Sequence, residues 1–254
     1  MPDDGSIGAG SGRFPITRFS AVLGARSGDE AERRRSIETL IAVYWKPVYT
    51  YLRLRWRRGG EDAKDLTQGF FLRALEKDFF AGYEPAKGRF RTFLRACLDR
   101  YVANQDQAES RLKRGGSAPA VPLEFAAAEA DLAAARATSA RSPEESFDAE
   151  WVRSLFGLAI EALRADCAAS GKEVHFRLFE RYDLEDAGAG RATYETLAAE
   201  FHLPVTQVTN HLAFARRELR RHLLLALREI TGSDEEYRRE ARLLLGTEPQ
   251  GEVK

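Results

Sequence analysis

Apolar residues recur at intervals of three and four along most of this sequence, and this spacing limits what the chain can fold into. The most regular stretch begins at Arg89 and places its apolar side chains at Phe90, Phe93, Leu94, Cys97, Leu98, Tyr101 and Val102. Such intervals bring side chains onto one face of an α-helix. Stretches of alternating apolar and polar residues, which would indicate strands, are nearly absent. The sequence therefore predicts an all-α fold.

Composition and charge limit the class of protein. The chain has 254 residues, of which 44% are hydrophobic, enough for the cores of one or two domains. Its 39 basic residues are balanced by 39 acidic ones, so any nucleic-acid binding has to come from local basic patches. The sequence contains no apolar run of membrane-spanning length, and its first twelve residues lack the apolar core of a signal peptide. We therefore expect a cytoplasmic protein without a membrane partner.

Residues that would carry catalysis or hold a metal are not grouped in recognisable patterns. Cys97 and Cys167 occupy apolar positions of predicted helices, which favours reduced buried thiols over a disulfide. The four histidines lack the partner spacing of a zinc site, so no metal or other cofactor is expected. A glycine-rich phosphate loop, a nucleophile with its base and a carboxylate cluster are all missing from the sequence. We therefore expect a protein that is not an enzyme.

The helical patterns and their interruptions predict two helical domains joined by a flexible linker. The segment between them is rich in Ala, Pro, Ser and Glu and has room for one weak helix. A short charged helix is expected at 234–245 and receives no role. The predicted division is a disordered N-terminus at 1–12, a first domain at 13–116, the linker at 117–146, a second domain at 147–230 and an extension at 231–254.

The segment 194–221 predicts two short amphipathic helices joined by a tight turn. Its apolar positions form two stripes, Tyr194, Leu197, Ala198 and Phe201 in the first helix, and Val205, Val208, Leu212, Ala215 and Leu219 in the second. Pro204 follows the break, where its fixed φ and missing N–H suit the start of a helix. The small side chain of Ala198 lets the two helices approach closely, as in a helix-turn-helix.

The open flank of the second helix is polar, and a basic stretch follows it. Candidate readers of base edges in the major groove are Thr206, Gln207, Thr209, Asn210 and His211. Arg216, Arg217, Arg220 and Arg221 lie within two turns without a nearby run of acids, which favours phosphate contact. The alternative interpretation is an ordinary helical hairpin with a solvated basic face.

The sequence resembles the two conserved domains of a bacterial RNA polymerase sigma factor of the extracytoplasmic-function (ECF) type, over about two thirds of the chain. Residues 61–77, EDAKDLTQGFFLRALEK, look like region 2.2 of that family, with its core at Asp65-Leu66-Thr67-Gln68. Residues 88–105, GRFRTFLRACLDRYVANQ, are similar to regions 2.3 and 2.4, and residues 194–221 to region 4.2.

The resemblance implies three binding surfaces. The first docks on the clamp helices of the largest polymerase subunit and comprises Asp65, Gln68 and Leu72. The second holds the single-stranded non-template strand of the downstream promoter element and comprises Arg91, Arg95, Arg100, Asn104, Arg111, Lys113 and Arg114. The third reads the upstream element as duplex DNA through Thr206, Gln207, Asn210, His211, Arg216, Arg217 and Arg220. The period of Phe93 favours a core position over a stacking platform for bases.

The implied function is transcription initiation: the chain binds core RNA polymerase, directs promoter recognition and melts the start region. The resemblance also leaves room for an anti-sigma factor as a partner. The alternative is a helix-turn-helix transcriptional regulator that acts without polymerase. Two positions depart from the family pattern. Gly69 stands where the family has Glu, and His202 replaces the usual turn glycine, where we expect a left-handed backbone at some cost in strain.

Overall fold

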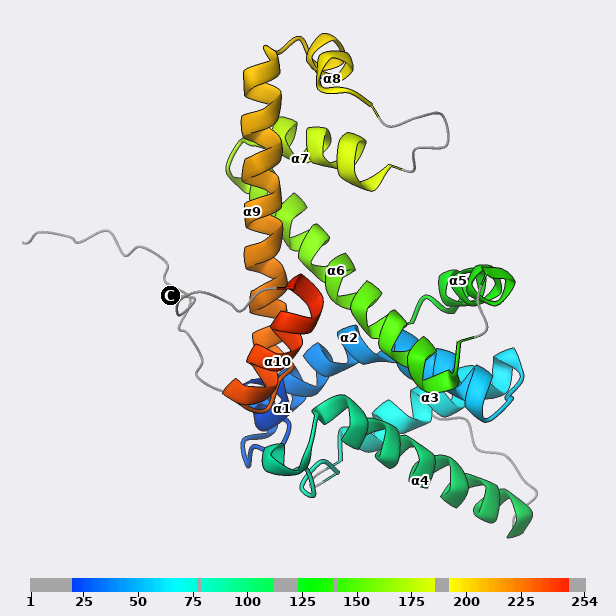
Figure 1. Ribbon diagram of the computed structural model, residues 1–254. Coiled ribbons are helices and arrows are strands. Elements are labelled where there is room, and N and C mark those ends of the chain that lie inside the picture. Colours follow the sequence, from blue (N-terminus) through cyan, green and yellow to red (C-terminus); the bar gives the residue numbers. More distant parts are fainter. Residues whose placement is uncertain (1–19, 77–78, 112–122, 139–140, 186–191, 247–254) are drawn as a thin grey trace, which may run out of the picture.

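The structure, a computed structural model, describes residues 20–76, 79–111, 123–138, 141–185 and 192–246. All regular elements within these ranges are helices, so the all-α prediction is confirmed (Figure 1). The predicted disordered segment 1–12 lies outside the described residues. None of the helices in the described ranges is both long enough and apolar enough to cross a membrane.

The first half of the chain packs around one long helix. Its elements are α1 (Ala21–Gly24), α2 (Glu30–Arg55), α3 (Gly60–Ala74), the 3-10 helix η1 (Pro85–Lys87) and α4 (Phe90–Arg111). The Asp29 carboxylate caps α2 by accepting hydrogen bonds from the amides of Ala31 and Glu32. Phe90 is buried among Tyr44, Phe80 and Tyr83, with ring centroids 5.2 to 5.7 Å apart.

Part of the predicted linker is a helix fixed to α2. This helix, α5 (Phe125–Thr138), buries Phe125 against Trp45 and Tyr49 at centroid distances of 5.5 and 5.1 Å. Arg53 of α2 donates two hydrogen bonds to Glu129, 2.6 and 3.2 Å long. Aromatic rings on α2 thus provide the apolar surface that holds an alanine-rich segment in place.

The helix α6 (Pro143–Ala169) begins in the predicted linker and continues without a break into the predicted second domain. Ser142 and Glu145 form a reciprocal capping box at its start. Its first half buries Trp151 and Leu155 in a cluster with α2, and its second half buries Leu163 in a second cluster. The predicted boundary at residue 147 therefore does not coincide with a boundary between the two apolar clusters.

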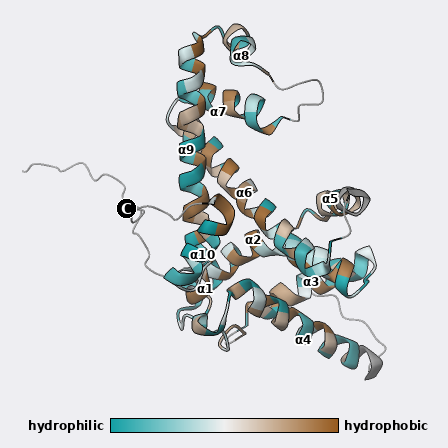
Figure 2. Cartoon of the chain, viewed as in Figure 1, coloured by the Kyte–Doolittle hydropathy of each residue, from teal (hydrophilic) through white to brown (hydrophobic). Residues whose placement is uncertain are grey.

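The second half contains α7 (Glu173–Phe179), the π-helix η2 (Glu180–Leu184), α8 (Tyr194–Phe201), α9 (Val205–Glu229) and α10 (Asp234–Leu245). Figure 1 shows α7 and α8 near one end of α9, and α1 and α10 near the other. Hydrophilic and hydrophobic residues are mixed along α9 (Figure 2), and its buried side chains recur at intervals of three and four from Val208 to Ala215. Leu223 and Leu227 at the far end of α9 join the first cluster, so α9 extends beyond the predicted segment and also links both clusters.

Side-chain burial agrees with several sequence expectations. Cys97 is half-buried and Cys167 is buried, and both are free, as predicted. Burial raises the pKa of Cys97 to about 11. Phe93 is half-buried and packs against the first cluster, with its ring centroid 5.4 Å from that of Tyr83. This environment supports the core position predicted for Phe93.

Candidate nucleic-acid interface

The turn between α8 and α9 has a left-handed residue at its centre. His202 has φ 54° and ψ 44°, which confirms the expected conformation. The amide of Leu203 donates to the carbonyl of Ala198 at 2.9 Å, and Pro204 caps α9 with φ −60°. Thr193 caps α8 by accepting a hydrogen bond from the amide of Thr196. The predicted helix pair thus exists with a short, locally satisfied connection.

The start of α9 has a buried side and an exposed side. Val208 and Leu212 are buried together with Leu197 of α8. The predicted base readers Thr206, Gln207 and Asn210 are all exposed. Thr209 is half-buried, and its hydroxyl donates back to the carbonyls of Val205 and Thr206, which reduces its capacity for other hydrogen bonds.

His211 belongs to a ring cluster between α7 and α9. Its imidazole stacks on that of His175, with centroids 3.8 Å apart and an interplanar angle of 34°. Phe214 meets His175 edge-on at 5.1 Å, and the ammonium group of Lys172 lies 4.3 Å from the Phe214 centroid. Burial and the neighbouring His211 lower the pKa of His175. This stacking is a packing role that the sequence did not indicate for His211.

The arginines of α9 have acidic partners, contrary to the expectation that no acids neutralise them. Arg216 donates two hydrogen bonds of 2.9 Å to Asp183, which raises its pKa. Arg221 donates to Glu218 at 2.8 Å and to Asp166 at 2.9 Å. The expectation was wrong because Asp166 and Asp183 come from α6 and η2, far away in sequence.

The two remaining arginines differ in exposure. Arg217 keeps 67% of its side chain exposed, although its Nε lies 3.6 Å from a carboxylate oxygen of the adjacent Glu218. Arg220 is half-buried. Of the four predicted phosphate contacts on α9, Arg217 therefore reaches furthest into solvent.

Arg91, which the resemblance assigns to the surface that holds the opened strand, is buried in the structure, contrary to that expectation. Only 4% of Arg91 is exposed, and its guanidinium lies 4.4 Å from the Trp151 ring centroid. Its Nη1 is 3.1 Å from a carboxylate oxygen of Glu240, and its Nε is 3.5 Å from Asp148. The helices α6 and α10 cover this side of α4, and local periodicity carries no information about them.

Arg95 is also turned inward. It pairs with Asp148 at 3.3 Å and lies over the Phe147 ring at 5.2 Å, with 17% of its side chain exposed. Arg95, assigned to the same strand-binding surface, is thus largely covered as well, because the start of α6 packs against it.

The remaining members of this predicted set lie further along α4. Arg100 and Asn104 are exposed. Arg111 ends the helix, and its side chain lies outside what the structure describes. Lys113 and Arg114 lie outside the described residues altogether.

The predicted polymerase-docking residues lie on α3. Asp65 is exposed, Gln68 and Leu72 are half-buried, and Phe70 and Ala74 on the same helix are buried. Packing explains why residue 69 is a glycine, which the sequence resemblance did not suggest. A Cβ at this position would collide with the Tyr101 hydroxyl of α4, so glycine permits close approach of the two helices.

No role was predicted for α10, but its carboxylates contact the start of α4. Glu236 accepts hydrogen bonds from the amide of Phe90 at 2.7 Å and the hydroxyl of Tyr83 at 3.0 Å. Glu240 pairs with Arg89 at 3.2 Å and with Arg91. The available signal was the spacing of four between two acids beside the apolar Tyr237 and Ala241, which places them on a shared side of a helix.

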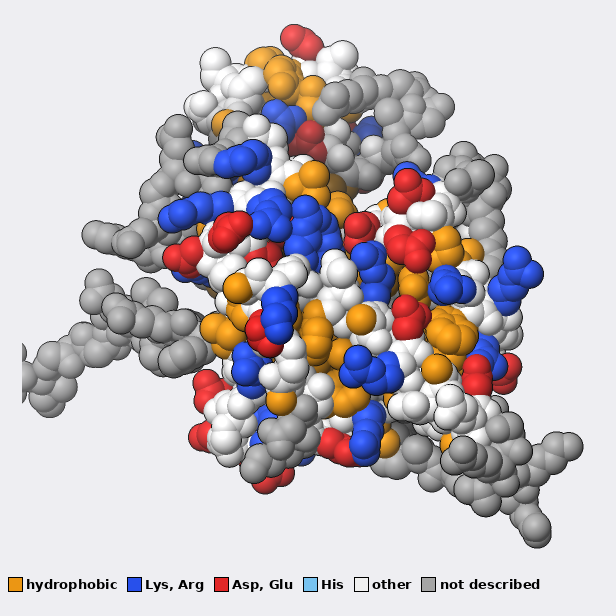
Figure 3. All heavy atoms as spheres, turned by 60° about the horizontal axis from the view of Figure 1, so that its bottom comes forward, with side chains coloured by type: hydrophobic (Ala, Val, Ile, Leu, Met, Phe, Trp, Pro, Cys, Tyr) orange, Lys and Arg blue, Asp and Glu red, His pale blue; other side chains and the backbone are white. Residues whose placement is uncertain are grey.

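Charge is mixed on the face that Figure 3 brings forward. Lys and Arg side chains there are interspersed with acidic and apolar ones. In the part of the chain that the structure describes, no group of three or more His, Cys, Asp or Glu could hold a metal ion. Comparison with protein-family models, with curated proteins and with solved structures gives no match for this chain.

Proposed function

We propose that this chain is a sigma factor of the ECF type, which binds core RNA polymerase and directs promoter recognition and melting. The observation that carries the proposal is the helix pair α8–α9. Its second helix buries an apolar stripe and leaves Thr206, Gln207 and Asn210 exposed at its start. In helix-turn-helix proteins, the first residues of the second helix are the ones that reach base edges in the major groove.

Within this proposal, α9 divides its polar residues between reading and positioning. Thr206, Gln207 and Asn210 read the upstream element, and Arg217 contacts the DNA backbone. Arg220, half-buried, lies at the margin of this surface. Arg216 and His211 hold α9 against η2 and α7 and do not contact DNA directly.

Two further surfaces complete the proposal. The exposed Asp65, with Gln68 and Leu72 beside it, docks on polymerase, because a polar patch on an apolar-backed helix can bind a protein surface. Arg100 and Asn104 on α4 contact the opened strand. Cations and hydrogen-bonding groups of this kind hold the backbone and the unstacked bases of single-stranded DNA.

The test is to mix the purified chain with core RNA polymerase, measure co-elution, and assay transcription from promoter templates. We expect both, and we expect the double variant Asp65→Ala with Gln68→Ala to co-elute less. Glu38→Ala on α2 is the matched control, because Glu38 is an exposed acid outside α3. Failure of the wild-type chain to co-elute contradicts the proposal.

The same experiment separates the second function class. A helix-turn-helix regulator binds duplex DNA tightly on its own and ignores polymerase. Tight binding to duplex DNA without co-elution would therefore replace the sigma-factor proposal with that alternative.

A further inference from the structure

The start of α4 receives a carboxylate from a helix almost 150 residues away. Glu236 of α10 accepts a hydrogen bond of 2.7 Å from the amide of Phe90, the first residue of α4. The other oxygen of this carboxylate accepts two hydrogen bonds, from the amide of Gly232 at 2.8 Å and from the hydroxyl of Tyr83 at 3.0 Å. Glu236 thus satisfies a donor at a helix N-terminus, the place where backbone N–H groups favour an anion.

A second carboxylate lies beside the first. Glu240 pairs with Arg89 at 3.2 Å and with Arg91 at 3.1 Å, and its side chain is only 2% exposed. Asp148 of α6 lies on the other side of Arg91. Charges buried in this way lose hydration, and their mutual attraction offsets that loss only in part. The contact between α10 and the start of α4 therefore depends on specific ion pairs and not on apolar burial alone.

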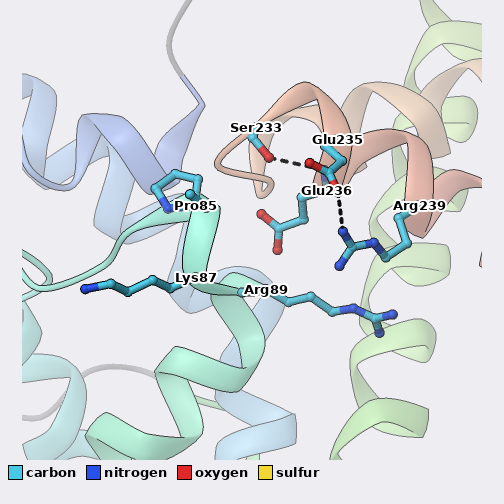
Figure 4. Close-up of a pocket in the computed structure, with 9 residues that line it drawn as sticks. Pro85, Lys87, Arg89, Ser233, Glu235, Glu236 and Arg239 are labelled. Atoms are coloured by element: carbon cyan, nitrogen blue, oxygen red, sulfur yellow. Dashed lines mark hydrogen bonds and ion pairs between the residues drawn. The ribbon is translucent and has the colours of Figure 1, made fainter.

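The approach of α10 depends on a glycine and leaves a hollow. A Cβ on Gly232 would come within 2.6 Å of the Tyr83 ring, so any larger residue there would push the two segments apart. Between η1 and α10 lies a cavity of about 180 Å³, whose charged lining residues are Lys87, Arg89, Glu235, Glu236 and Arg239 (Figure 4). Part of the contact, at Arg89 and Glu236, therefore borders a cavity, which makes it easier to open than a closed apolar core.

We propose that α10 is an intramolecular cover for an anion-binding surface at the start of α4, and that this surface binds the backbone of single-stranded DNA once α10 is displaced. The carboxylates of Glu236 and Glu240 occupy the positions that backbone phosphates would take. This inference rests on the proposed function, because it treats Arg89 and Arg91 as part of the strand-binding surface of α4.

The chemistry of the covered groups suits phosphate as well as carboxylate. A guanidinium binds either anion through the same fork of N–H donors, and a helix N-terminus accepts either. The acidic helix therefore competes directly with nucleic acid for one set of donors. Displacing α10 would free Arg89 and the Nη1 of Arg91 from Glu240, while Asp148 and Trp151 of α6 stay beside Arg91.

The test removes the two carboxylate charges that hold the cover, in the full chain. In the double variant Glu236→Gln with Glu240→Gln, we expect faster amide hydrogen exchange throughout α10. We also expect an affinity for a fluorescent single-stranded oligonucleotide that is higher by about fivefold or more, a typical coupling between competing sites. The matched control is Glu38→Gln with Glu161→Gln, which removes the same charge from two exposed positions outside α10. We expect neither effect in the control.

Two further variants make the inference falsifiable. Gly232→Ala releases α10 sterically without a change of charge and is expected to raise oligonucleotide affinity in the same direction. Adding Arg91→Ala to the double variant of Glu236→Gln with Glu240→Gln is expected to remove the gain. Faster exchange in α10 without a gain over the control overturns the proposal. Unchanged exchange in both release variants also overturns it, because the named contacts would then not hold α10.

Failure of the proposed function has a different signature. Co-elution with core polymerase depends on α3 and is measured on the same proteins. If wild type and all variants fail to co-elute while oligonucleotide affinity still rises on release, the sigma-factor proposal fails and the cover stands. If co-elution persists while affinity does not rise, only the cover fails.

Discussion

Arg216 of α9 and Asp183 of η2 are joined by two hydrogen bonds, from Nε to Oδ2 and from Nη2 to Oδ1, each 2.9 Å long. The same guanidinium lies 5.3 Å from the ring centroid of Tyr182. A planar fork held at both nitrogens and stacked on a ring fixes orientation in a way that a lysine cannot. Arg216 therefore sets the position of α9 against η2, and it is not a free phosphate contact.

A double-mutant cycle of Arg216→Ala and Asp183→Ala tests this assignment. Because the pair is partly exposed, we expect a coupling free energy of unfolding of about 1 kcal/mol or less in urea denaturation. Asp183→Ala alone is expected to leave duplex DNA affinity unchanged or to lower it, since α9 loses its support. A clear rise in affinity would mean that Asp183 competes with phosphate for Arg216, contrary to a positioning role.

Gly69 and Tyr101 define how closely α3 and α4 approach. In Gly69→Ala, the new methyl group meets the Tyr101 hydroxyl, so overpacking opposes the gain in helix propensity of about 1 kcal/mol. We expect no net stabilisation, or a loss, in chemical denaturation. In a Tyr101→Phe background, which lacks the hydroxyl, the same substitution is expected to stabilise the fold.

Gly157 provides the control for that comparison. It lies exposed within α6, and a Cβ there meets no atom within 4 Å. Gly157→Ala should therefore stabilise the protein by about 0.5–1 kcal/mol. If Gly69→Ala gives the same stabilisation in the wild-type background, the packing explanation for this glycine is wrong.

Features that depend on local sequence could be predicted well. The helix α10 begins at Asp234 and ends at Leu245, the bounds expected from its pattern, because caps and periodicity are local. The left-handed backbone at His202 follows from the same kind of information, since a turn of this length needs one residue with positive φ.

Features that depend on distant contacts could not be predicted. The residues next to Arg91 in the sequence do not distinguish it from an exposed arginine. Arg91 is buried because Glu240 of α10 and Trp151 of α6, both distant in the sequence, pack against it. Asp183 likewise reaches Arg216 from 33 positions away. The course of α6 through both apolar clusters was missed for a related reason, because composition marks a change of segment but not which core a helix joins.

The stacked histidines make stability depend on pH. Burial and the neighbouring His211 lower the pKa of His175. As pH falls, the unfolded chain therefore binds a proton at this residue at a higher pH than the folded chain does. The contribution of His175 to the free energy of unfolding is therefore fully present above the unfolded pKa of about 6.5. It is lost as pH falls from that value towards the lower pKa of the folded state. His222, whose pKa burial also lowers, acts in the same direction.

His175→Phe isolates the first of these contributions. The variant keeps a ring against His211 and Phe214 but cannot take up a proton. We expect its unfolding free energy, measured by urea denaturation at pH 7.5 and 5.5, to decrease less than that of wild type. Equal decreases in the two proteins would show that His175 does not titrate within this window.

Under the proposed function, Asn210 and Arg217 should differ in what they contribute to promoter binding. Asn210 is exposed at the start of α9, where an amide can read a base edge, and its loss should cost about 1–3 kcal/mol on one sequence only. Arg217 is the most exposed arginine of the basic stretch on α9, and its loss should weaken binding to all sequences and reduce the salt dependence by about one ion.

The measurement compares Asn210→Ala and Arg217→Ala in complex with core polymerase, on promoter fragments with an intact or altered upstream element, over a range of salt concentrations. Thr209→Ala is the control, because the Thr209 hydroxyl already bonds within its own helix and its removal should leave discrimination unchanged. If Asn210→Ala weakens binding equally on every fragment, then the start of α9 does not read sequence.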